Sequence, residues 1–495
     1  MQTLLALLPL LSIFVCLFVW KQTALRASVA SYGVIVCLVY FYAPFALPAS
    51  TILHMTAKGA LICLIVGYVL FFGMFLFHLM NEAGAIASIA SFISHATSNR
   101  VAQTLLLCFG LCPLIESVSG FGIGFMVVAP IFLALGFPPM QAALLSFIGL
   151  LASAWGALAT GTIIGSELTG LSLANIGSGT AFLSMPIFVY FMMVALYMVA
   201  GKVRGVLWRQ ALVMLSSFSG SIVLFSLYVS VELAGVLASI VTTACGLLLL
   251  KEKNVVPYAE HAAALQTGES MLKVFSPYLF LTICILLSRV IPTMQQFLQS
   301  HGVLKVERYS YKLAFLYSPG FWLFCTCMFT IIVFRLSFHS VKQSLRHTCK
   351  QWLPFALTTT MFISLSEIMA ISGMHALLAQ TAGDALDVSF IFIAPLVGAI
   401  GGFLTGSNAG SNAMFMKLQV QTAQHIGVSW QSVAISQNTA SSISTIACPA
   451  RSTLGAHICA IPHRENELLR KTVILISGAV LLVVIEIGIW YMMSG

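Results

Sequence analysis

The chain has 495 residues, of which 59% are hydrophobic and only 7% are charged, and its mean hydropathy is +1.01. Soluble domains carry about 25% charged residues, so this composition excludes a soluble globular protein and indicates an integral membrane protein. The apolar runs are longer than the alternating strands of a barrel, which favours an all-α polytopic fold. The net charge of +9 does not indicate nucleic-acid binding, because the basic residues gather in short loops between apolar runs.

Cysteine usage indicates neither disulfides nor a metal centre. The twelve cysteines lie mostly in apolar runs, as Cys108 and Cys112 do, and none has metal-ligand spacing with histidines. No cleavable leader is evident, because no Lys or Arg precedes the first apolar run and Lys21 and Arg26 follow it. We therefore expect no metal, no cofactor and an N-terminus on the outer side of the membrane.

Apolar runs of spanning length predict about twelve transmembrane helices in chain order. Each run is long enough to cross the hydrocarbon core as a helix, and short polar segments separate the runs. The predicted spans lie near 3–20, 28–47, 57–80, 141–161, 180–200, 206–229, 231–250, 273–291, 313–335, 350–371, 430–447 and 472–493.

The charges of the connecting loops predict which side of the membrane each loop faces, since Lys and Arg favour the cytoplasm. The strongest cytoplasmic prediction is the loop at 335–350. The loop at 292–312 is an exception, because it should face outside and yet is basic. The residues that carry these charges are Lys202, Arg204, Lys251 and Lys253 in two further inside loops, Arg335, Lys342, Arg346 and Lys350 in the strongest one, and Lys305, Arg308 and Lys312 in the exception.

Two regions do not read as simple spans. Residues 101–135 consist of two apolar arms around "ESVSGFG", and residues 388–425 consist of two arms around "LTGSNAGSN". An arm of about 15 helical residues reaches about 22 Å, which is short of a ~30 Å hydrocarbon core. Such a pair can enter and leave on one side as a re-entrant hairpin, with its irregular tip near the midplane.

These two regions resemble each other in their surroundings. The segment "NEAGAIASIASFI" parallels "AISGMHALLAQ", and "LGFPPMQAALLS" parallels "IGVSWQSVAIS". The loop charges make the spans before the two regions run in opposite directions, so we expect an inverted repeat, which is typical of secondary transporters. The expected parts are N-terminal helices at 1–56, a first repeat at 57–178 with its tip near 116–122, connecting helices at 179–349, a second repeat at 350–462 with its tip near 405–412, and a last helix at 463–495.

The two tips are the predicted substrate-binding segments. Glycine lets the backbone unwind and lets a ligand approach closely, and free N–H groups at a half-helix N-terminus attract an anion. The alternative is that Gly and Ser only allow close helix packing. The candidate residues are Ser117, Ser119, Gly120, Phe121 and Gly122 at the first tip, and Thr405, Gly406, Ser407, Asn408, Ser411 and Asn412 at the second.

Two acids inside apolar segments are candidates for proton coupling. Glu116 stands beside the first tip, where a carboxylate is costly in its ionised form and therefore suits a proton carrier. The alternative is a glutamate at a helix end that reaches water. Glu367, in "SLSEIMA", is the second candidate, and its alternative role is that of a structural hydrogen-bond partner.

Two arginines are candidates for binding an anionic substrate. Pro449 interrupts the helix in "STIACPARSTLGA", and Arg451 follows it directly. A guanidinium stays charged and binds a carboxylate through two bonds, although it can also anchor a helix end in the headgroups. Arg289 ends the span at 273–291, where an ordinary interfacial anchor is the alternative.

The sequence is similar to the L-lactate permease family, which also transports glycolate. The segment "SGFGIGFMVVAPIFLALGFPP" resembles the family's glycine-rich segment, and "GGFLTGSNAGSNAMFMKLQ" followed by "TAQHIGVS" resembles its second signature. The resemblance implies proton symport of short 2-hydroxymonocarboxylates across the bacterial cytoplasmic (inner) membrane. The family usually has a small residue, often glycine, where Ser117 stands, and "SPQ" where this chain has "CPAR". Arg451 lies near the position of that glutamine, so the preferred acid can differ from lactate.

Two rival functions stay open at this point. Serine hydroxyls and tip carbonyls can hold Na⁺, which makes a sodium-coupled transporter of another small carboxylate the first alternative. An intramembrane enzyme is the second, and the sequence offers it no catalytic dyad, metal cluster or nucleotide loop. The expected partners are a small carboxylate, protons or Na⁺, and membrane lipid, without nucleic acid; a homodimer is left open.

Overall fold

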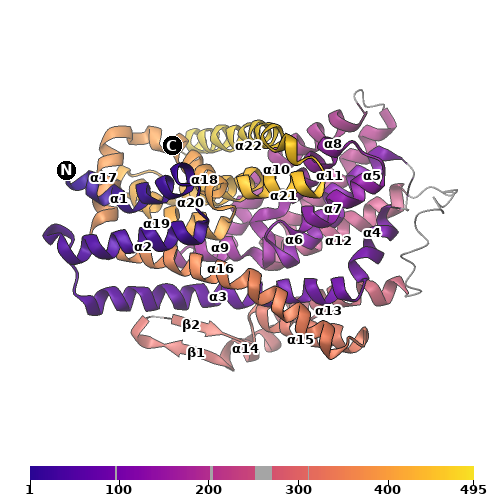
Figure 1. The fold of residues 1–495 in the computed structure, drawn as a ribbon, viewed down its shortest axis with the longest axis horizontal. Coiled ribbons are helices and arrows are strands. Elements are labelled where there is room, and N and C mark those ends of the chain that lie inside the picture. Colours follow the sequence, from indigo (N-terminus) through magenta and orange to yellow (C-terminus); the bar gives the residue numbers. More distant parts are fainter. Residues whose placement is uncertain (95–96, 98, 201–204, 251–269, 310, 495) are drawn as a thin grey trace.

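The computed structural model describes residues 1–94, 97, 99–200, 205–250, 270–309 and 311–494, and helices make up most of this chain (Figure 1). Within these ranges, eleven helical segments are long and apolar enough to cross a membrane. This confirms the all-α polytopic fold, close to the expected twelve spans. Two basic loops that were predicted to face the cytoplasm lie outside the described residues: Lys202 with Arg204, and Lys251 with Lys253.

The chain begins with two helices and then a long one. α1 (Gln2–Phe14) continues through a π-helical turn at Val15–Val19 and precedes α2 (Ala24–Phe41). α3 (Ala49–Glu82) follows. The next part is a series of shorter helices: α4 (Ala85–Ser94), α5 (Arg100–Leu106), a π-helical turn at Leu107–Leu111, α6 (Cys112–Ser119), α7 (Ile123–Ala134), α8 (Pro139–Ile148), a 3₁₀ segment at Gly149–Trp155 and α9 (Gly156–Thr169).

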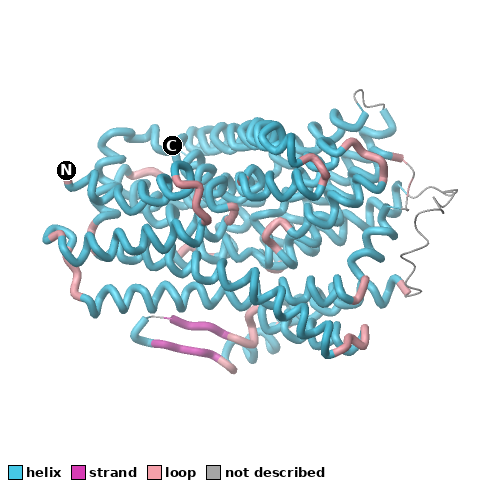
Figure 2. Tube along the Cα trace, in the orientation of Figure 1, coloured by secondary structure: helices cyan, strands magenta, loops and turns pink. Residues whose placement is uncertain are grey.

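The middle of the chain holds long helices and the one sheet of the described residues, a two-stranded β-hairpin. Figure 2 shows this β-hairpin beside the helical body. The elements are α10 (Leu173–Ala200), α11 (Gly205–Tyr228), α12 (Val231–Leu250), α13 (Met271–Val290), α14 (Pro292–Ser300), β1 (Val303–Val306), β2 (Tyr311–Ala314) and α15 (Pro319–Val333).

The last third repeats the element order that begins at α3: a long helix, a short helix, a helix–tip–helix pair, a broken helix and a long helix. α16 has 34 residues, as α3 has. The elements are α16 (Phe338–Ile371), α17 (Met374–Leu386), α18 (Phe390–Thr405), α19 (Asn408–Ile426), α20 (Trp430–Ser444), a 3₁₀ turn at Thr445–Ala447, α21 (Pro449–Ile458) and α22 (Glu465–Ser494).

The two long helices α3 and α16 pack against each other in opposite directions. Nε2 of His78, near the end of α3, lies 3.2 Å from Oε1 of Gln351 in the first half of α16. Ser364, near the end of α16, donates to the carbonyl of Thr56 near the start of α3. The helices that follow them, α4 and α17, accordingly lie at opposite ends of the molecule in Figure 1.

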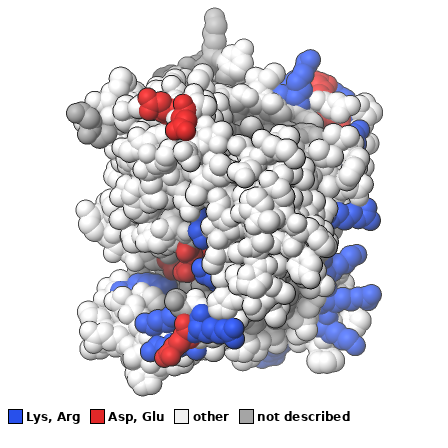
Figure 3. All heavy atoms as spheres, turned by 90° about the vertical axis from the view of Figure 1, so that its left-hand side faces the viewer, with Lys and Arg blue, Asp and Glu red and all other residues white. Residues whose placement is uncertain are grey.

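This packing defines two ends of the molecule. The β-hairpin end is where α3 begins, α16 ends and β1–β2 lie, on the left of Figure 1. The opposite end is where α3 ends and α16 begins. Figure 3 looks onto the β-hairpin end, where uncharged atoms cover most of the face and the charged side chains stand in a few groups.

Several predicted spans differ in the structure. The run near 3–20 is a shorter apolar helix, Gln2–Leu17, and the span near 350–371 begins at Phe338, so most of the predicted loop at 335–350 is helical. The span near 313–335 begins later, at Pro319, because strand β2 occupies Tyr311–Ala314. The predicted continuous span near 430–447 is wrong, since α20 has 15 residues and the chain then breaks before Pro449, which lacks an N–H donor. The span near 141–161 is broken between α8 and α9.

The predicted arm lengths of the first helix–tip–helix pair also need correction. Its first arm, Arg100–Ser119, has 20 residues, because a π-helical turn joins α5 to α6, whereas α7 has 12. The arms of the second pair, α18 and α19, have 16 and 19 residues. A re-entrant path through the membrane therefore stays a prediction.

The apolar core forms two large clusters. One packs residues of α4 to α13 with α20, α21 and α22, and includes Trp155 and Phe109. The other packs α1, α2 and α3 against α16, α17 and α19, and includes Phe355 and Phe362. The polar cavity described next is lined by elements of both clusters.

Candidate functional site

The first tip is a run of left-handed backbone between α6 and α7. Gly120, Phe121 and Gly122 have φ angles of 68°, 59° and 82°. Glycine adopts this region freely, but a phenylalanine does so only where the surroundings hold it. A side chain at Gly120 would lie 2.8 Å from the Cβ of Ala157, so the tip fits closely against the start of α9.

Glu116 occupies the N-terminus of α7. One carboxylate oxygen accepts the backbone N–H of Gly122 at 3.0 Å, and the other accepts that of Gly124 at 3.3 Å. These are two of the N–H groups that a helix start leaves without a helical partner. The positive end of the helix dipole also stabilises a negative charge there. A buried acid therefore fills the place where the sequence predicts an anionic substrate.

The second tip is a shorter turn between α18 and α19. Gly406 has a φ of 63°, and Ser407 caps α19 by accepting the N–H of Gly410 at 3.2 Å. A side chain at Gly406 would lie 2.8 Å from the sulfur of Cys448. The second tip therefore packs directly on the break between α20 and α21.

Two helix breaks meet the two tips. In the first break, Ala157, Leu158 and Ala159 have φ angles of 41°, 55° and 65°, a conformation that costs about 1–2 kcal/mol per L-residue. In the second, the 3₁₀ turn at Thr445–Ala447 ends at Cys448, and Pro449 starts α21. Strained backbone of this kind persists only when packing enforces it, and it gathers at ligand sites.

The tips and the breaks enclose a small cavity. Its volume is about 40 Å³. One water molecule needs roughly 10–15 Å³, so the cavity has room for about three waters. Its lining consists of Leu70, Glu116, Gly120, Phe121, Ser153, Gly156, Ala157, Thr160, Gly161, Phe355, Gly406, Ser407, Asn408, Ala409, Thr445 and Arg451.

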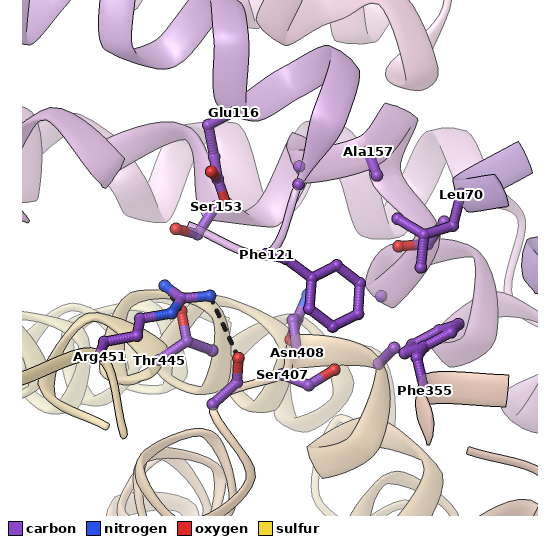
Figure 4. A pocket seen from close by; sticks show the side chains of 16 residues that line it. Leu70, Glu116, Phe121, Ser153, Ala157, Phe355, Ser407, Asn408, Thr445 and Arg451 are labelled. Carbon is purple, nitrogen blue, oxygen red and sulfur yellow. Dashed lines mark hydrogen bonds between the residues drawn. The ribbon is translucent and has the colours of Figure 1, made fainter. Parts of the chain in front are cut away.

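Glu116 and Arg451 reach this cavity from opposite sides (Figure 4). Arg451 donates from Nη1 to the hydroxyl of Thr445 and from Nη2 to the carbonyl of Gly406, both at 3.1 Å. These bonds use two of the five N–H groups of the guanidinium. On another side of the cavity the rings of Phe121 and Phe355 pack edge to face, with centroids 5.2 Å apart. The cavity thus combines a cation, an acid and an aromatic wall.

The predicted site residues, for substrate binding and for proton coupling, fall into those that line the cavity and those that do not. Seven of the predicted site residues line the cavity: Glu116, Gly120, Phe121, Gly406, Ser407, Asn408 and Arg451. The other predicted tip residues are not part of the lining, and Arg289 and Glu367 lie away from the cavity. Those tip residues are Ser117, Ser119, Gly122, Thr405, Ser411 and Asn412.

The supporting residues of the second tip belong to a buried amide network. Oδ1 of Asn438 accepts from Nδ2 of Asn408 at 2.9 Å and from Nδ2 of Asn412 at 2.8 Å. Nδ2 of Asn438 donates to Thr180 on α10 at 2.9 Å. Ser411 accepts from Gln437 at 3.2 Å. Asn438 and Gln437 thus fix the second tip to α20 and α10.

Sequence reasoning missed several residues that shape this site. Asn438 and Gln437 stand in "SQNTASS", a polar run inside a segment expected to span the membrane, and that polarity was a signal. Ser153 and Thr160 line the cavity from the first break. Thr445 joins them from the second break.

Arg289 lies away from the cavity and has partners of its own. Its Nη2 lies 3.1 Å from Oε1 of Glu232, its Nη1 donates to the carbonyl of Tyr317 at 3.0 Å, and its guanidinium lies 3.6 Å from the centre of the Tyr317 ring. These contacts hold α12, α13 and the segment before α15 together. The predicted role of Arg289 in substrate binding therefore finds no support in its position.

Glu367 is held between two lysines rather than beside a tip. Its oxygens lie 2.8 Å from Nζ of Lys58 on α3 and 2.8 Å from Nζ of Lys417 on α19. The side chain of Glu367 is only 5% exposed, whereas those of Lys58 and Lys417 are 34% and 22% exposed. We call this group the ion triad. Its geometry agrees with the structural alternative for Glu367, and its role in proton coupling stays a prediction.

The whole chain is similar in sequence to known bacterial permeases. The sequence profile of the L-lactate permease family matches residues 2–310 and 304–494. An L-lactate permease of Streptococcus iniae is 24% identical over 86% of this chain and 92% of its own length. An L-lactate permease of Salmonella typhimurium is 25% identical over 96% of this chain and 93% of its own length. A glycolate permease of Escherichia coli is 25% identical over 96% and 92%. These matches and the eleven membrane-spanning segments identify a multi-pass membrane transporter. The relatives are bacterial, which is consistent with the predicted location in the bacterial cytoplasmic membrane.

Proposed function

The chain belongs to the L-lactate permease family, and we propose that it imports small 2-hydroxymonocarboxylates, such as lactate or glycolate, by symport with protons. Its relatives are named L-lactate permease and glycolate permease. The cavity between the tips supports the same class of substrate, because it offers a cation for a carboxylate and hydroxyl groups for a 2-hydroxyl.

Arg451 is the group that we propose for the substrate carboxylate. An anion that enters a buried site loses hydration, and that loss costs several kcal/mol unless charged or oriented donors replace water. Arg451 uses two of its five N–H groups for its bonds to Thr445 and Gly406. The other three can donate charge-assisted hydrogen bonds to a substrate carboxylate. Ser153, Thr160 and Ser407 line the same cavity and are candidates for the substrate hydroxyl.

Glu116 is the group that we propose for the proton, and its contacts with α7 carry the proposal. Its carboxylate accepts hydrogen bonds from the N–H groups of Gly122 and Gly124 and lines the same small cavity as Arg451. A second carboxylate in this cavity would repel an ionised Glu116. Protonation of Glu116 removes that repulsion and weakens its hold on the α7 N-terminus. Proton and substrate would therefore bind together, as symport requires.

The repeated element order supports alternating access as the transport mechanism. α3 and α16, the first helices of the two proposed repeats, run in opposite directions, and a helix–tip–helix pair follows each of them. Inverted repeats with broken helices around a central site are typical of secondary transporters. We propose that the two pairs, with their tips at the cavity, open it in turn toward each side.

Uptake into proteoliposomes tests the proposed function directly. Labelled lactate and glycolate should accumulate when the outer buffer is more acidic than the lumen, in a sodium-free medium. An ionophore that collapses the pH gradient should abolish the accumulation. Accumulation that needs Na⁺ and ignores the pH gradient would instead establish the sodium-coupled alternative.

The coupling role of Glu116 has its own test. Glu116→Gln should abolish proton-driven accumulation, while counterflow of labelled against unlabelled substrate continues, because exchange needs binding but no net proton movement. Glu486→Gln is a matched control, since Glu486 is an acid in α22 that does not line the cavity. Normal accumulation by Glu116→Gln would show that another group carries the proton.

A further inference from the structure

The β-hairpin concentrates positive charge where the topology predicts an outer loop. Lys305 on β1 and Lys312 on β2 stand directly opposite each other, and Arg308 lies in the turn between the strands. Like charges in directly opposed positions destabilise a strand pair. All three side chains are exposed, and none forms an ion pair within the described part of the chain. Glu307, in the same turn, offsets one of these charges, so the β-hairpin itself keeps a surplus of two positive charges. Glu167, an exposed acid near the end of α9, lies close enough to Tyr311 on β2 to interact with it electrostatically.

The β-hairpin is fixed beside the ion triad. The ring of Tyr309, in the turn, stacks on the ring of His54 in α3, with centroids 4.4 Å apart. His54 precedes Lys58 by one helical turn, so the two lie on the same face of α3. Figure 1 shows the β-hairpin alongside the first half of α3. The turn that carries Arg308 therefore lies near the segment of α3 that carries Lys58.

The ion triad itself carries an uncompensated positive charge. The carboxylate of Glu367 forms ion pairs with two ammonium groups, those of Lys58 and Lys417, so the three groups together carry a net charge of about +1. Both lysines are partly exposed, whereas Glu367 is almost completely buried. An anion from solution can thus reach the lysines without displacing Glu367.

The three helices of the ion triad also line the cavity. Leu70 follows Lys58 by twelve residues on α3, and Phe355 precedes Glu367 by twelve on α16. Ala409 precedes Lys417 by eight residues on α19. With a rise of 1.5 Å per residue, the triad lies about 12–18 Å from the cavity along these helices, toward the β-hairpin end.

We propose that the substrate anion approaches the cavity from the β-hairpin end along a basic approach path, which consists of Lys305, Arg308 and Lys312 on the β-hairpin and Lys58 and Lys417 in the ion triad. The path raises the local concentration of small carboxylates and holds them briefly between the two lysines. This inference rests on the proposed function for the nature of the anion. It also gives the one exceptional basic loop of the sequence a role that the positive-inside rule does not.

The β-hairpin is tested by removing its charge. In right-side-out proteoliposomes, the triple variant Lys305→Gln, Arg308→Gln and Lys312→Gln should raise the KM for lactate or glycolate about three- to fivefold at low ionic strength. The maximal rate should not change. At 1 M salt, where the Debye length is about 3 Å, the difference from the unmodified protein should disappear. The matched control is Lys342→Gln, Arg346→Gln and Lys350→Gln, which removes three exposed charges at the opposite end and should leave this KM unchanged.

The triad is tested separately. Lys58→Gln leaves the contact between Lys417 and Glu367 in place, removes the surplus charge and should raise the KM about threefold at low salt. Lys58→Arg should restore it. A KM equal to that of the unmodified protein in both the β-hairpin variant and Lys58→Gln, or an equal effect of the opposite-end control, would overturn the basic approach path. If the unmodified protein takes up none of these acids, the proposed function itself fails.

Discussion

Replacement of Arg451 is the most direct measure of how the cavity binds a carboxylate. Nη1 and Nη2 each make one bond within the protein, at 3.1 Å, and Nε lies 3.3 Å from the place where a Cβ of Gly122 would stand. The guanidinium is therefore held against both tips with N–H groups to spare. One charge-assisted bond to a substrate carboxylate contributes roughly 1.5–3 kcal/mol. At about 1.4 kcal/mol per decade, Arg451→Gln should weaken apparent affinity by about tenfold to a hundredfold.

The assay is concentration-dependent uptake by purified, reconstituted variants, normalised to the amount of folded protein. Arg451→Lys should recover only part of the affinity, because it keeps the charge but loses the planar fork. Arg470→Gln, an exposed arginine in α22, is the matched control and should bind as the unmodified protein does. Unchanged affinity in folded Arg451→Gln would remove Arg451 from the site and leave only the tips to bind the anion.

Three further predictions concern the tips, the amide network and the orientation of the chain. Gly122→Ala should lower the free energy of unfolding by about 1–2 kcal/mol. The φ of Gly122 is 82°, and the new Cβ would lie 2.9 Å from the Phe125 ring. Gly220→Ala, in a helix with open space around it, should keep or raise stability in the same unfolding assay. Asn438→Ala should cost about 1–3 kcal/mol for each buried amide donor it leaves unpaired, seen as a lower unfolding temperature; an unchanged temperature would mean that water replaces the amide. In a background in which the native exposed cysteines Cys37 and Cys349 are replaced by serine, single cysteines placed in 338–350 should react with an impermeant reagent only from the cytoplasmic side. Reaction only from outside would reverse the predicted orientation.

The membrane class and the all-α fold could be predicted from the sequence because they depend on composition and run length. In the membrane, every backbone N–H and C=O group of a spanning segment needs a hydrogen-bond partner within the protein. A helix supplies these partners from its own residues. The tips could be located for a similar reason. Gly120, Gly122 and Gly406 permit left-handed backbone that few other residues adopt, and Pro449, which lacks an N–H donor, starts α21 directly after the break. These glycine and proline signals depend only on neighbouring residues, so a single sequence is enough to locate them.

The partners of the charged groups were decided only by tertiary structure. Lys58 lies 309 residues from Glu367 in the chain, and Arg289 lies 57 residues from Glu232. Arg289 and Glu367 are, like Glu116 and Arg451, charges in or beside apolar runs, so residue type and setting alone do not reveal which of the four share the cavity. Helix packing brings Arg451 and Glu116 to one cavity and gives Arg289 and Glu367 partners elsewhere. The energy of a buried charge depends on which opposite charges and donors surround it, and only the packed helices fix those neighbours.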